Sequence, residues 1–185
     1  MFTLRRHVGR MSRYDRRRVP GGTYFFTVRL QDRGSRLLTD RIVLLRDCVR
    51  LCRNRFDFII EAAVVLPDHL HMIWTLPAED DDYSARWRMI KATFSRHVER
   101  PATICPSKLA RGEKGIWQRR FWEHLVRDQA DFDVYRAYAL TAPVRAGLVP
   151  RPQDWPYSSI HRDLARTGPL ALQLGDKGVG AMRVA

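Results

Sequence analysis

The hydrophobic pattern of the first 76 residues predicts three β-strands. Residues 23–30 (TYFFTVRL) alternate, so that every even-numbered side chain is apolar and the polar ones fall on the opposite face. Residues 56–66 are rich in β-branched and other apolar side chains, and residues 69–76 (HLHMIWTL) alternate again. Pro67-Asp68 separates the last two segments and predicts a tight turn, so we expect them to pair as a hairpin.

Helical spacing of apolar residues predicts three longer helices. The first follows a cap at Thr39-Asp40, the second is capped by Ser84, and the third follows Asp128 and ends near Pro143 and Gly147. Residues 101–115 are expected to be a loop because prolines and glycines interrupt them. Residues 116–127 (IWQRRFWEHLVR) then predict a fourth strand of irregular form.

The resulting order of elements is β-α-β-β-α-β-α. Helices between strands, with one hairpin in the middle, predict an α+β fold of the ferredoxin-like kind. We expect a split β-α-β sandwich, in which an antiparallel sheet carries its helices on one face. A single domain is expected at residues 14–165, with a basic arm at residues 1–13 and a tail at residues 166–185.

The net charge of the chain indicates what kind of partner it binds. Lysine and arginine together number 33 against 20 acidic residues, a net charge of +13, and only four of the basic residues are lysine. Such an excess favours a polyanionic partner, most often nucleic acid, although a GC-rich genome or a need for solubility also raises arginine content. No apolar run is long enough for a membrane span, no secretory signal is present, and the three cysteines lack the spacing of a disulfide framework. We therefore expect a cytoplasmic protein without a membrane partner.

Two histidines stand out in VVLPDHLHMIWTLP, residues 64–77. In a strand, His69 and His71 share one face, while the even-numbered residues 70–76 form the apolar face. Two imidazoles at this spacing can chelate one divalent ion and leave coordination positions open. The same pair can equally be ordinary composition on a solvated face, because such a short motif has low specificity.

Further along the chain, aromatic and basic residues suggest two more functional groups. Tyr135 and Tyr138 share a face of the third helix, and either can face a metal on the sheet or belong to the core. Aromatic residues of the fourth strand, among them Trp117, alternate with Arg119 and Arg120, a pattern that suits stacking on unpaired bases and binding of phosphates, or else a buried strand. The basic run of Arg16, Arg17 and Arg18 can grip DNA or be a solvated arm.

Taken together, these motifs resemble a known family. The chain is similar to the REP-associated tyrosine transposases, bacterial relatives of the single-strand insertion-sequence transposases within the histidine-hydrophobic-histidine (HUH) superfamily. The resemblance covers about residues 14–165 in the same order. Besides the histidine segment, it is carried by GGTYFFTVRL, SARWRMIKATFSRHV, IWQRRFWEHLVRDQADF, YRAYALTAPVRAGLV and WPYSSIHRDLA.

The resemblance implies a reaction and a site. The family's nucleophile lies four residues before an Asn-Pro-Val that leads to Ala-Gly-Leu, and Pro143-Val144 sets this register, so Tyr138 is implied to attack a phosphodiester and form a 5′-phosphotyrosine. His69 and His71 are implied to hold Mg²⁺ or Mn²⁺, although spacing alone also allows zinc. The implied substrate is single-stranded DNA with REP hairpins, handled in the bacterial nucleoid. The resemblance favours a monomer over a dimer.

One position departs from the family pattern. The expected Asn, a potential metal ligand, is replaced by Ala142. Water or the DNA phosphate can complete the shell, or another donor such as Thr141 or Glu123 can substitute, with His124 also expected near the active face. Alternatively, the protein is catalytically weak or inactive and only binds hairpin DNA. A third hypothesis is a metal-dependent ribonuclease of ferredoxin-like fold.

Overall fold

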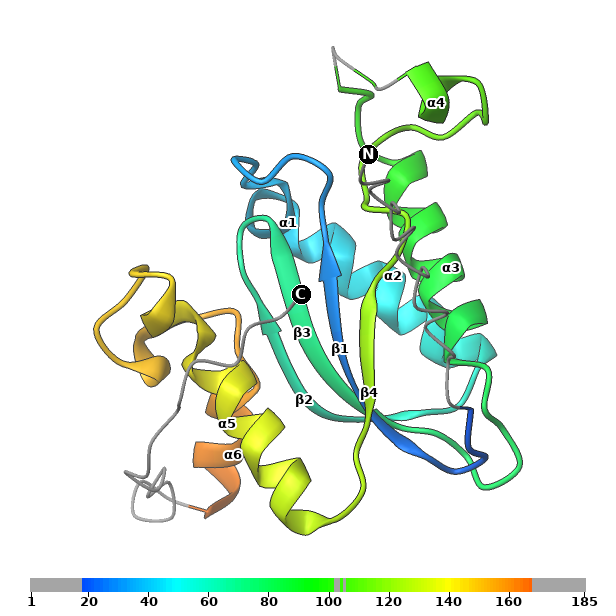
Figure 1. The fold of residues 1–185 in the computed structure, drawn as a ribbon. Helices are drawn as coiled ribbons and strands as arrows, with labels where there is room; N and C mark the ends of the chain where they lie inside the picture. Colours follow the sequence, from blue (N-terminus) through cyan, green and yellow to red (C-terminus); the bar gives the residue numbers. More distant parts are fainter. Residues whose placement is uncertain (1–17, 102–103, 105, 168–185) are drawn as a thin grey trace, which may run out of the picture.

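A four-stranded antiparallel sheet organises the molecule (Figure 1). The structure is a computed structural model that describes residues 18–101, 104 and 106–167. The strand order is β2-β3-β1-β4, which is the order of a ferredoxin-like split β-α-β sheet. The strands are β1 (Thr23–Arg29), β2 (Ile59–Val65), β3 (His69–Thr75) and β4 (Trp122–Leu125). The α+β fold expected from the sequence is thereby confirmed.

The helices cover both faces of this sheet, which corrects the expectation of helices on one face. α2 and α3 pack on one face, and α5 packs on the other against β2 and β3 (Figure 1). The bounds are α1 (Leu37–Asp40), α2 (Ile42–Arg55), α3 (Tyr83–Arg96), α4 (Pro106–Leu109), α5 (Gln129–Arg145), the 3₁₀ helix η1 (Pro152–Asp154) and α6 (Ile160–Thr167). The alternation in the strands predicts one apolar face of the sheet. The other face is also buried, because the third of the long helices, α5, packs on it.

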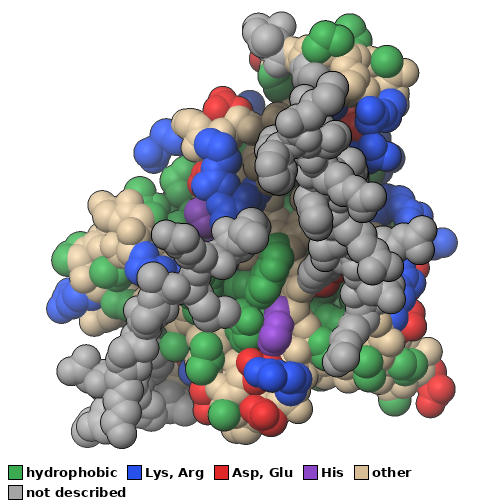
Figure 2. All heavy atoms as spheres, viewed as in Figure 1, with side chains coloured by type: hydrophobic (Ala, Val, Ile, Leu, Met, Phe, Trp, Pro, Cys, Tyr) green, Lys and Arg blue, Asp and Glu red, His purple; other side chains and the backbone are tan. Residues whose placement is uncertain are grey.

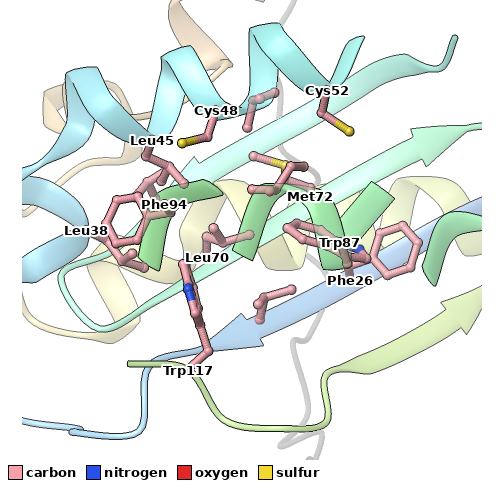
Figure 3. Packing of buried hydrophobic residues seen from close by; sticks show 14 of the residues in the cluster. Phe26, Leu38, Leu45, Cys48, Cys52, Leu70, Met72, Trp87, Phe94 and Trp117 are labelled. Carbon is pink, nitrogen blue, oxygen red and sulfur yellow. The ribbon is translucent and has the colours of Figure 1, made fainter. Parts of the chain in front are cut away.

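The larger core lies between the sheet and the helix pair α2–α3. Even-numbered side chains of β1 and β3 enter it, as the strand alternation predicts, and Trp87 of α3 stacks on Trp74 with ring centroids 4.3 Å apart. Cys48 and Cys52 of α2 are buried in the same core as free thiols, where they pack as small apolar side chains (Figure 3).

A second, smaller core lies between the sheet and α5. Phe25 of β1 and Ile73 of β3 are fully buried here against Ala139 and Leu140 of α5. The small alanine side chains let the helix approach the sheet closely. The sheet face that carries the histidines is therefore covered by α5 and is not the solvated face of the alternative interpretation.

Element boundaries differ from the sequence expectations in three places. The cap expected at Thr39-Asp40 is wrong, because these residues belong to α1 and the residue before α2 is Arg41, which makes no side-chain cap. The cap of α3 is Asp82, whose side chain accepts a hydrogen bond from Ala85 N, and not Ser84. Within residues 116–127 only β4 is a regular strand, because the preceding residues are held by side chains: Lys91 Nζ donates to Gln118 O (2.7 Å) and Lys108 Nζ to Trp117 O (2.9 Å). These lysines satisfy carbonyls that a regular ladder would otherwise pair. Asp128 caps α5 as predicted.

Several expectations fall on other parts of the chain. The basic arm at residues 1–13, Arg16, Arg17 and most of the tail at residues 166–185 lie outside the described residues. In the ranges that are described, no helix is both long and apolar enough to cross a bilayer.

A buried arginine joins α3 to the turn before it. Arg86 is 1% exposed, and its guanidinium donates to Asp80 Oδ2 (2.7 Å), Asp57 O (2.6 Å) and Asp82 O (3.0 Å). The rings of Phe56 and Phe58 lie over the same guanidinium at 5.4 and 5.6 Å. Because the charge is desolvated, its hydrogen bonds are strong and costly to lose.

Arg86→Met is expected to lower the free energy of unfolding by about 3 kcal/mol, because it leaves two carbonyls and a carboxylate without their donor. Urea denaturation followed by circular dichroism measures this. Arg88→Met on the exposed side of the same helix is the matched control and should change stability by less than about 0.5 kcal/mol. Equal effects of the two substitutions would contradict the structural role of Arg86.

Candidate active site

The candidate site begins with the two histidines of β3. His69 pairs with Arg29 and His71 with Thr27 of β1, so all four side chains lie on the α5 face of the sheet. The two imidazole rings are nearly perpendicular, with centroids 5.1 Å apart. The alternation in the sequence predicted this shared face correctly.

Each imidazole is oriented by a hydrogen bond at Nδ1. His69 Nδ1–H donates to Asp68 Oδ1 (2.7 Å), and Asp68 Oδ2 in turn accepts from Arg33 Nε (2.9 Å). His71 Nδ1 and Thr27 Oγ1 share a buried hydrogen bond of 2.9 Å. In both rings Nε2 has no hydrogen-bond partner among the described residues, and such bonds at Nδ1 are typical of metal-binding histidines.

The two imidazoles are held in the neutral form that binds metals. Burial lowers the pKa of His71 well below its ordinary value, and the nearby charges of His69, Arg145 and Arg29 lower it further. Burial also lowers the pKa of His69, although its bond to Asp68 works in the opposite direction. Metal binding at neutral pH therefore requires no deprotonation of these rings.

Tyr138 of α5 lies over the histidine face. Its ring is 5.4 Å from the ring of His71 and 6.0 Å from that of Phe25, both in edge-on contact. No described residue hydrogen-bonds its hydroxyl. Tyr135, one turn earlier, is 5% exposed and contacts His124 instead, with ring centroids 4.2 Å apart. The structure thus separates the two candidate tyrosines, and only Tyr138 faces the histidine pair while remaining half-buried.

Two arginines border Tyr138. The guanidinium of Arg145 lies over the phenol ring, with Cζ 3.9 Å from the ring centroid. Arg29 approaches from the end of β1, and its charge interacts with both Tyr138 and the histidines. Figure 2 shows basic side chains beside a histidine over this end of β1. The surroundings of Tyr138 are therefore positively charged.

The residues present suit a divalent ion held by two protein ligands. Both Nε2 atoms are available and their imidazoles are neutral, as described above. In the ranges that the structure describes, however, no group of three or more His, Cys, Asp or Glu side chains could hold a metal. Ala142 is 4% exposed and supplies no donor. If an ion binds here, oxygen atoms of water or of a bound phosphate would complete its shell, as is usual for Mg²⁺ and Mn²⁺.

Among the predicted supporting residues, Glu123 is on the wrong face. It pairs with Phe26, whose side chain enters the α2–α3 core, so the sheet separates Glu123 from the histidines. Its predicted role as an active-site support is contradicted by this register. Successive residues of β4 point to opposite faces of the sheet, so a shift of one residue in its pairing with β1 would move Glu123 to the histidine face. The sequence does not show this pairing, because the segment before β4 is irregular.

His124 and Thr141 do lie on the α5 side of the sheet, but both are already engaged. His124 Nε2 is 2.8 Å from Asp131 Oδ2. Burial alone would raise the pKa of Asp131, but its bonds to Arg127 and His124 hold it well below the usual range. Thr141 Oγ1 donates to Ala137 O and accepts from Arg145 Nη1 (2.5 Å). Neither side chain contacts the histidine pair directly.

The predicted DNA-binding residues divide into buried and exposed ones. Trp117 is 7% exposed and packs on Phe94 in the larger core (Figure 3), which contradicts its predicted stacking on bases. Arg119 and Arg120 are exposed, as binding would require. Arg18 is exposed but lies 3.6 Å from carboxylate oxygens of Asp81 and Asp82.

Four residues of the site were missed in the sequence. Thr27 and Arg29 lie on the polar face of the first strand, and the hairpin between β2 and β3 brings Asp68 beside His69. Arg145 follows Tyr138 by seven residues, two helical turns, so it shares the same face. The sequence shows on which face of its own element each of these side chains lies. Which of them meet depends on the pairing of the strands and on where α5 packs.

Comparison with known proteins identifies the family of the chain. No family model matches the chain. It is 45% identical over 156 residues to the REP-associated tyrosine transposase of Escherichia coli strain K12, covering 84% of this chain and 87% of that protein. It is 41% identical over 155 residues to a protein of Haemophilus influenzae assigned to the same family, covering 83% and 88%. A solved REP-associated tyrosine transposase bound to a REP hairpin matches with a TM-score of 0.75 at 42% identity, covering 95% of this chain and 100% of that one.

Proposed function

The chain belongs to the REP-associated tyrosine transposases, and on this premise we propose that it cuts and rejoins single-stranded DNA beside a REP hairpin with Tyr138 as nucleophile. The observation that carries the proposal is the contact between Tyr138 and His71, whose rings lie 5.4 Å apart across the helix–sheet interface. A phenol and two imidazoles with available Nε2 atoms meet there in a positively charged setting. That combination suits attack on a phosphodiester.

The cleavage step conserves the energy of the phosphodiester. Tyr138 Oη forms a bond to phosphorus, the bond from phosphorus to the 3′ oxygen breaks, and the phenol proton leaves through solvent as a 3′-hydroxyl is released. The product is a 5′-phosphotyrosine. Because the new phosphodiester replaces the old one, a 3′-hydroxyl can attack it and rejoin DNA without ATP.

The chain's own residues would prepare this step. His69 and His71 would hold a divalent ion, Mg²⁺ or Mn²⁺, through Nε2, while Asp68 and Thr27 fix the two rings. When bound, the ion polarises the scissile phosphate and offsets its developing charge. The helix–sheet packing places Tyr138 beside the rings, since Phe25 contacts both His71 and Tyr138. This fixed packing supplies the orientation that the reaction needs.

Hairpin DNA is the substrate that family membership favours, since the solved relative is bound to a REP hairpin. The net charge of +13 supports a nucleic-acid partner. Exposed Arg119 and Arg120, next to β4, are available for phosphate contacts. Action as a monomer and association with the nucleoid stay predictions.

Ala142 favours a second candidate function, binding of hairpin DNA without cleavage. Its methyl group is buried in the smaller core and cannot donate to a metal. The histidine pair would then lack the ligand that the family pattern implies at this position. The two candidates differ in one observable, the covalent bond between protein and DNA.

The deciding experiment incubates the protein with end-labelled single-stranded hairpin DNA and Mn²⁺, followed by denaturing electrophoresis. A covalent adduct together with a free 3′-hydroxyl product supports the proposal. Tight binding without an adduct at any metal concentration supports the second candidate. Cleavage of a matched RNA but not of DNA would instead support a ribonuclease.

Thr27→Val is expected to weaken Mn²⁺ binding about 10-fold, because the near-isosteric side chain removes the hydrogen bond that orients His71. Titration calorimetry of the metal-free protein with Mn²⁺ measures this without reference to activity. Thr23→Val on the same strand is the control, since Thr23 pairs with Thr75 and not with a histidine. Equal Mn²⁺ affinity of the two variants would show that Thr27 does not orient a ligand.

A further inference from the structure

Arg145 combines an exposed position with a fixed orientation. Its Nη1 donates to Thr141 Oγ1, and the flat face of the guanidinium rests on the Tyr138 ring at 3.9 Å. Stacking occupies the face of the guanidinium but leaves its remaining N–H groups at the edge. None of the described carboxylates lies within ion-pair distance of it, whereas Arg33 and Arg136 pair with Asp68 and Asp163. Arg145 is thus oriented by the protein but not neutralised by it.

Arg29 shows the same lack of neutralisation from the opposite side of the site. It lies at the end of β1, directly across from His69, and is half-buried. The carboxylate of Asp68 attracts this guanidinium, but that carboxylate is bonded to Arg33 Nε at 2.9 Å. Among the described residues, no side chain or carbonyl accepts a hydrogen bond from this guanidinium. Partial burial of an unpaired charge costs free energy, which an anionic ligand would recover.

The guanidiniums of Arg29 and Arg145 both border the histidine pair and Tyr138. Arg29 lies across from His69 on the strand side, and Arg145 of α5 covers the Tyr138 ring, which is 5.4 Å from the ring of His71. The rings of His69 and His71 are themselves 5.1 Å apart. Tyr138 thus lies under Arg145 and beside the histidine pair that Arg29 borders. A phosphate group in front of the Tyr138 hydroxyl would meet donors from both sides.

We propose that Arg29 and Arg145 form a binding site for one DNA phosphodiester, the scissile one, and hold its non-bridging oxygens beside the Tyr138 hydroxyl. This inference rests on the proposed function and adds two residues to it. Guanidiniums suit the task because their planar donors match phosphate oxygens and remain charged at all working pH values. They stabilise the added negative charge as Tyr138 Oη bonds to phosphorus.

The site also compensates for the missing ligand at position 142. With only two imidazoles as protein ligands, the ion alone would position the phosphate weakly. Two arginines that bind the same phosphate supply orientation which does not depend on the metal. That orientation would place the phosphate beside His69 and His71, the residues that would hold the ion.

The test is a binding cycle in the Tyr138→Phe background with EDTA, so that neither cleavage nor metal contributes. A series of hairpin oligonucleotides carries one uncharged methylphosphonate at each position in turn, and fluorescence anisotropy gives the dissociation constants. Arg145→Gln is expected to weaken binding of unmodified DNA about 10-fold. On DNA with the methylphosphonate at the cleaved position, the same substitution should have no further effect. Arg29→Gln should show the same two results, weaker binding of unmodified DNA and no further effect on the DNA modified at the cleaved position.

A kinetic comparison in the protein with Tyr138 intact completes the test. Arg145→Gln should slow formation of the covalent adduct about 100-fold, the size expected for one lost donor to a developing anion. Arg145→Lys should restore part of the rate, because it keeps the charge without the planar fork. Arg53→Gln, on the exposed side of α2, is the matched control and should alter neither binding nor rate.

The outcomes separate this inference from the function on which it rests. If the wild-type protein forms no adduct, the proposed cleavage fails, whatever the binding cycle shows. If adduct forms but Arg145→Gln loses the same affinity on every methylphosphonate, the arginine contacts no particular phosphate and the inference is overturned. Coupling to a phosphate other than the one that is cleaved overturns it as well.

Discussion

Tyr138→Phe is expected to abolish the covalent protein–DNA adduct while leaving hairpin binding within about twofold of the wild type. The substitution removes one oxygen atom, which no described residue hydrogen-bonds, so the fold loses no internal contact. The ring remains, with its edge contacts to His71 and Phe25 and its stacking under Arg145. Only the nucleophile is lost, and loss of a nucleophile typically costs about 10⁴-fold or more in rate.

Denaturing electrophoresis of labelled DNA measures the adduct, and anisotropy measures binding. Tyr135→Phe is the matched control because it lies one turn away on the same helix and is buried against His124. It should retain nearly all adduct formation. An adduct that persists in Tyr138→Phe and disappears in Tyr135→Phe would assign the nucleophile to the other tyrosine.

His71→Ala is expected to reduce cleavage at least about 100-fold and to leave hairpin affinity nearly unchanged. The imidazole is one of two protein ligands available to the metal, so its removal leaves His69 alone. Affinity for DNA depends mainly on arginine contacts to phosphates, which this change leaves in place. His71 is also buried, and the void left by alanine is expected to cost about 2 kcal/mol of stability.

Two measurements distinguish weaker metal binding from unfolding in the His71→Ala variant. Calorimetric titration with Mn²⁺ should show at least about 10-fold weaker binding, and thermal unfolding should still be cooperative. His97→Ala, an exposed histidine at the end of α3, is the control and should change neither cleavage nor Mn²⁺ affinity. Wild-type cleavage by His71→Ala would refute the metal assignment.

The structure narrows the explanations for Ala142. Glu123 cannot replace the missing ligand because its register places it on the other side of the sheet. The Thr141 hydroxyl is engaged with Ala137 O and Arg145, which makes it a poor substitute. What remains is an ion shell completed by water and phosphate, with the arginine pair holding the phosphate, or a protein that binds hairpins without cutting them.

The sequence by itself determined the elements and their faces. Alternation in residues 23–30 and 69–76 separated the core side chains from His69 and His71, because successive side chains of a strand point to opposite faces. The Asp128 cap and the spacing of Pro143 and Gly147 predicted the bounds of α5, because caps and breakers act locally. Residues 116–121 are irregular, as expected, and lysines from elsewhere in the chain bond to two of their carbonyls, which local patterns do not predict.

Only the tertiary structure decided which side chains meet. Glu123 and His124 are neighbours in sequence, yet strand register places them on opposite faces of the sheet. Tyr135 and Tyr138 share a helix face, yet the packing of α5 on β2 and β3 places only Tyr138 over the histidines. Arg29 and Arg145 are more than a hundred residues apart, and their approach depends on the same packing. Local patterns fix the direction of a side chain along its own element, whereas contacts between elements depend on how the whole core packs.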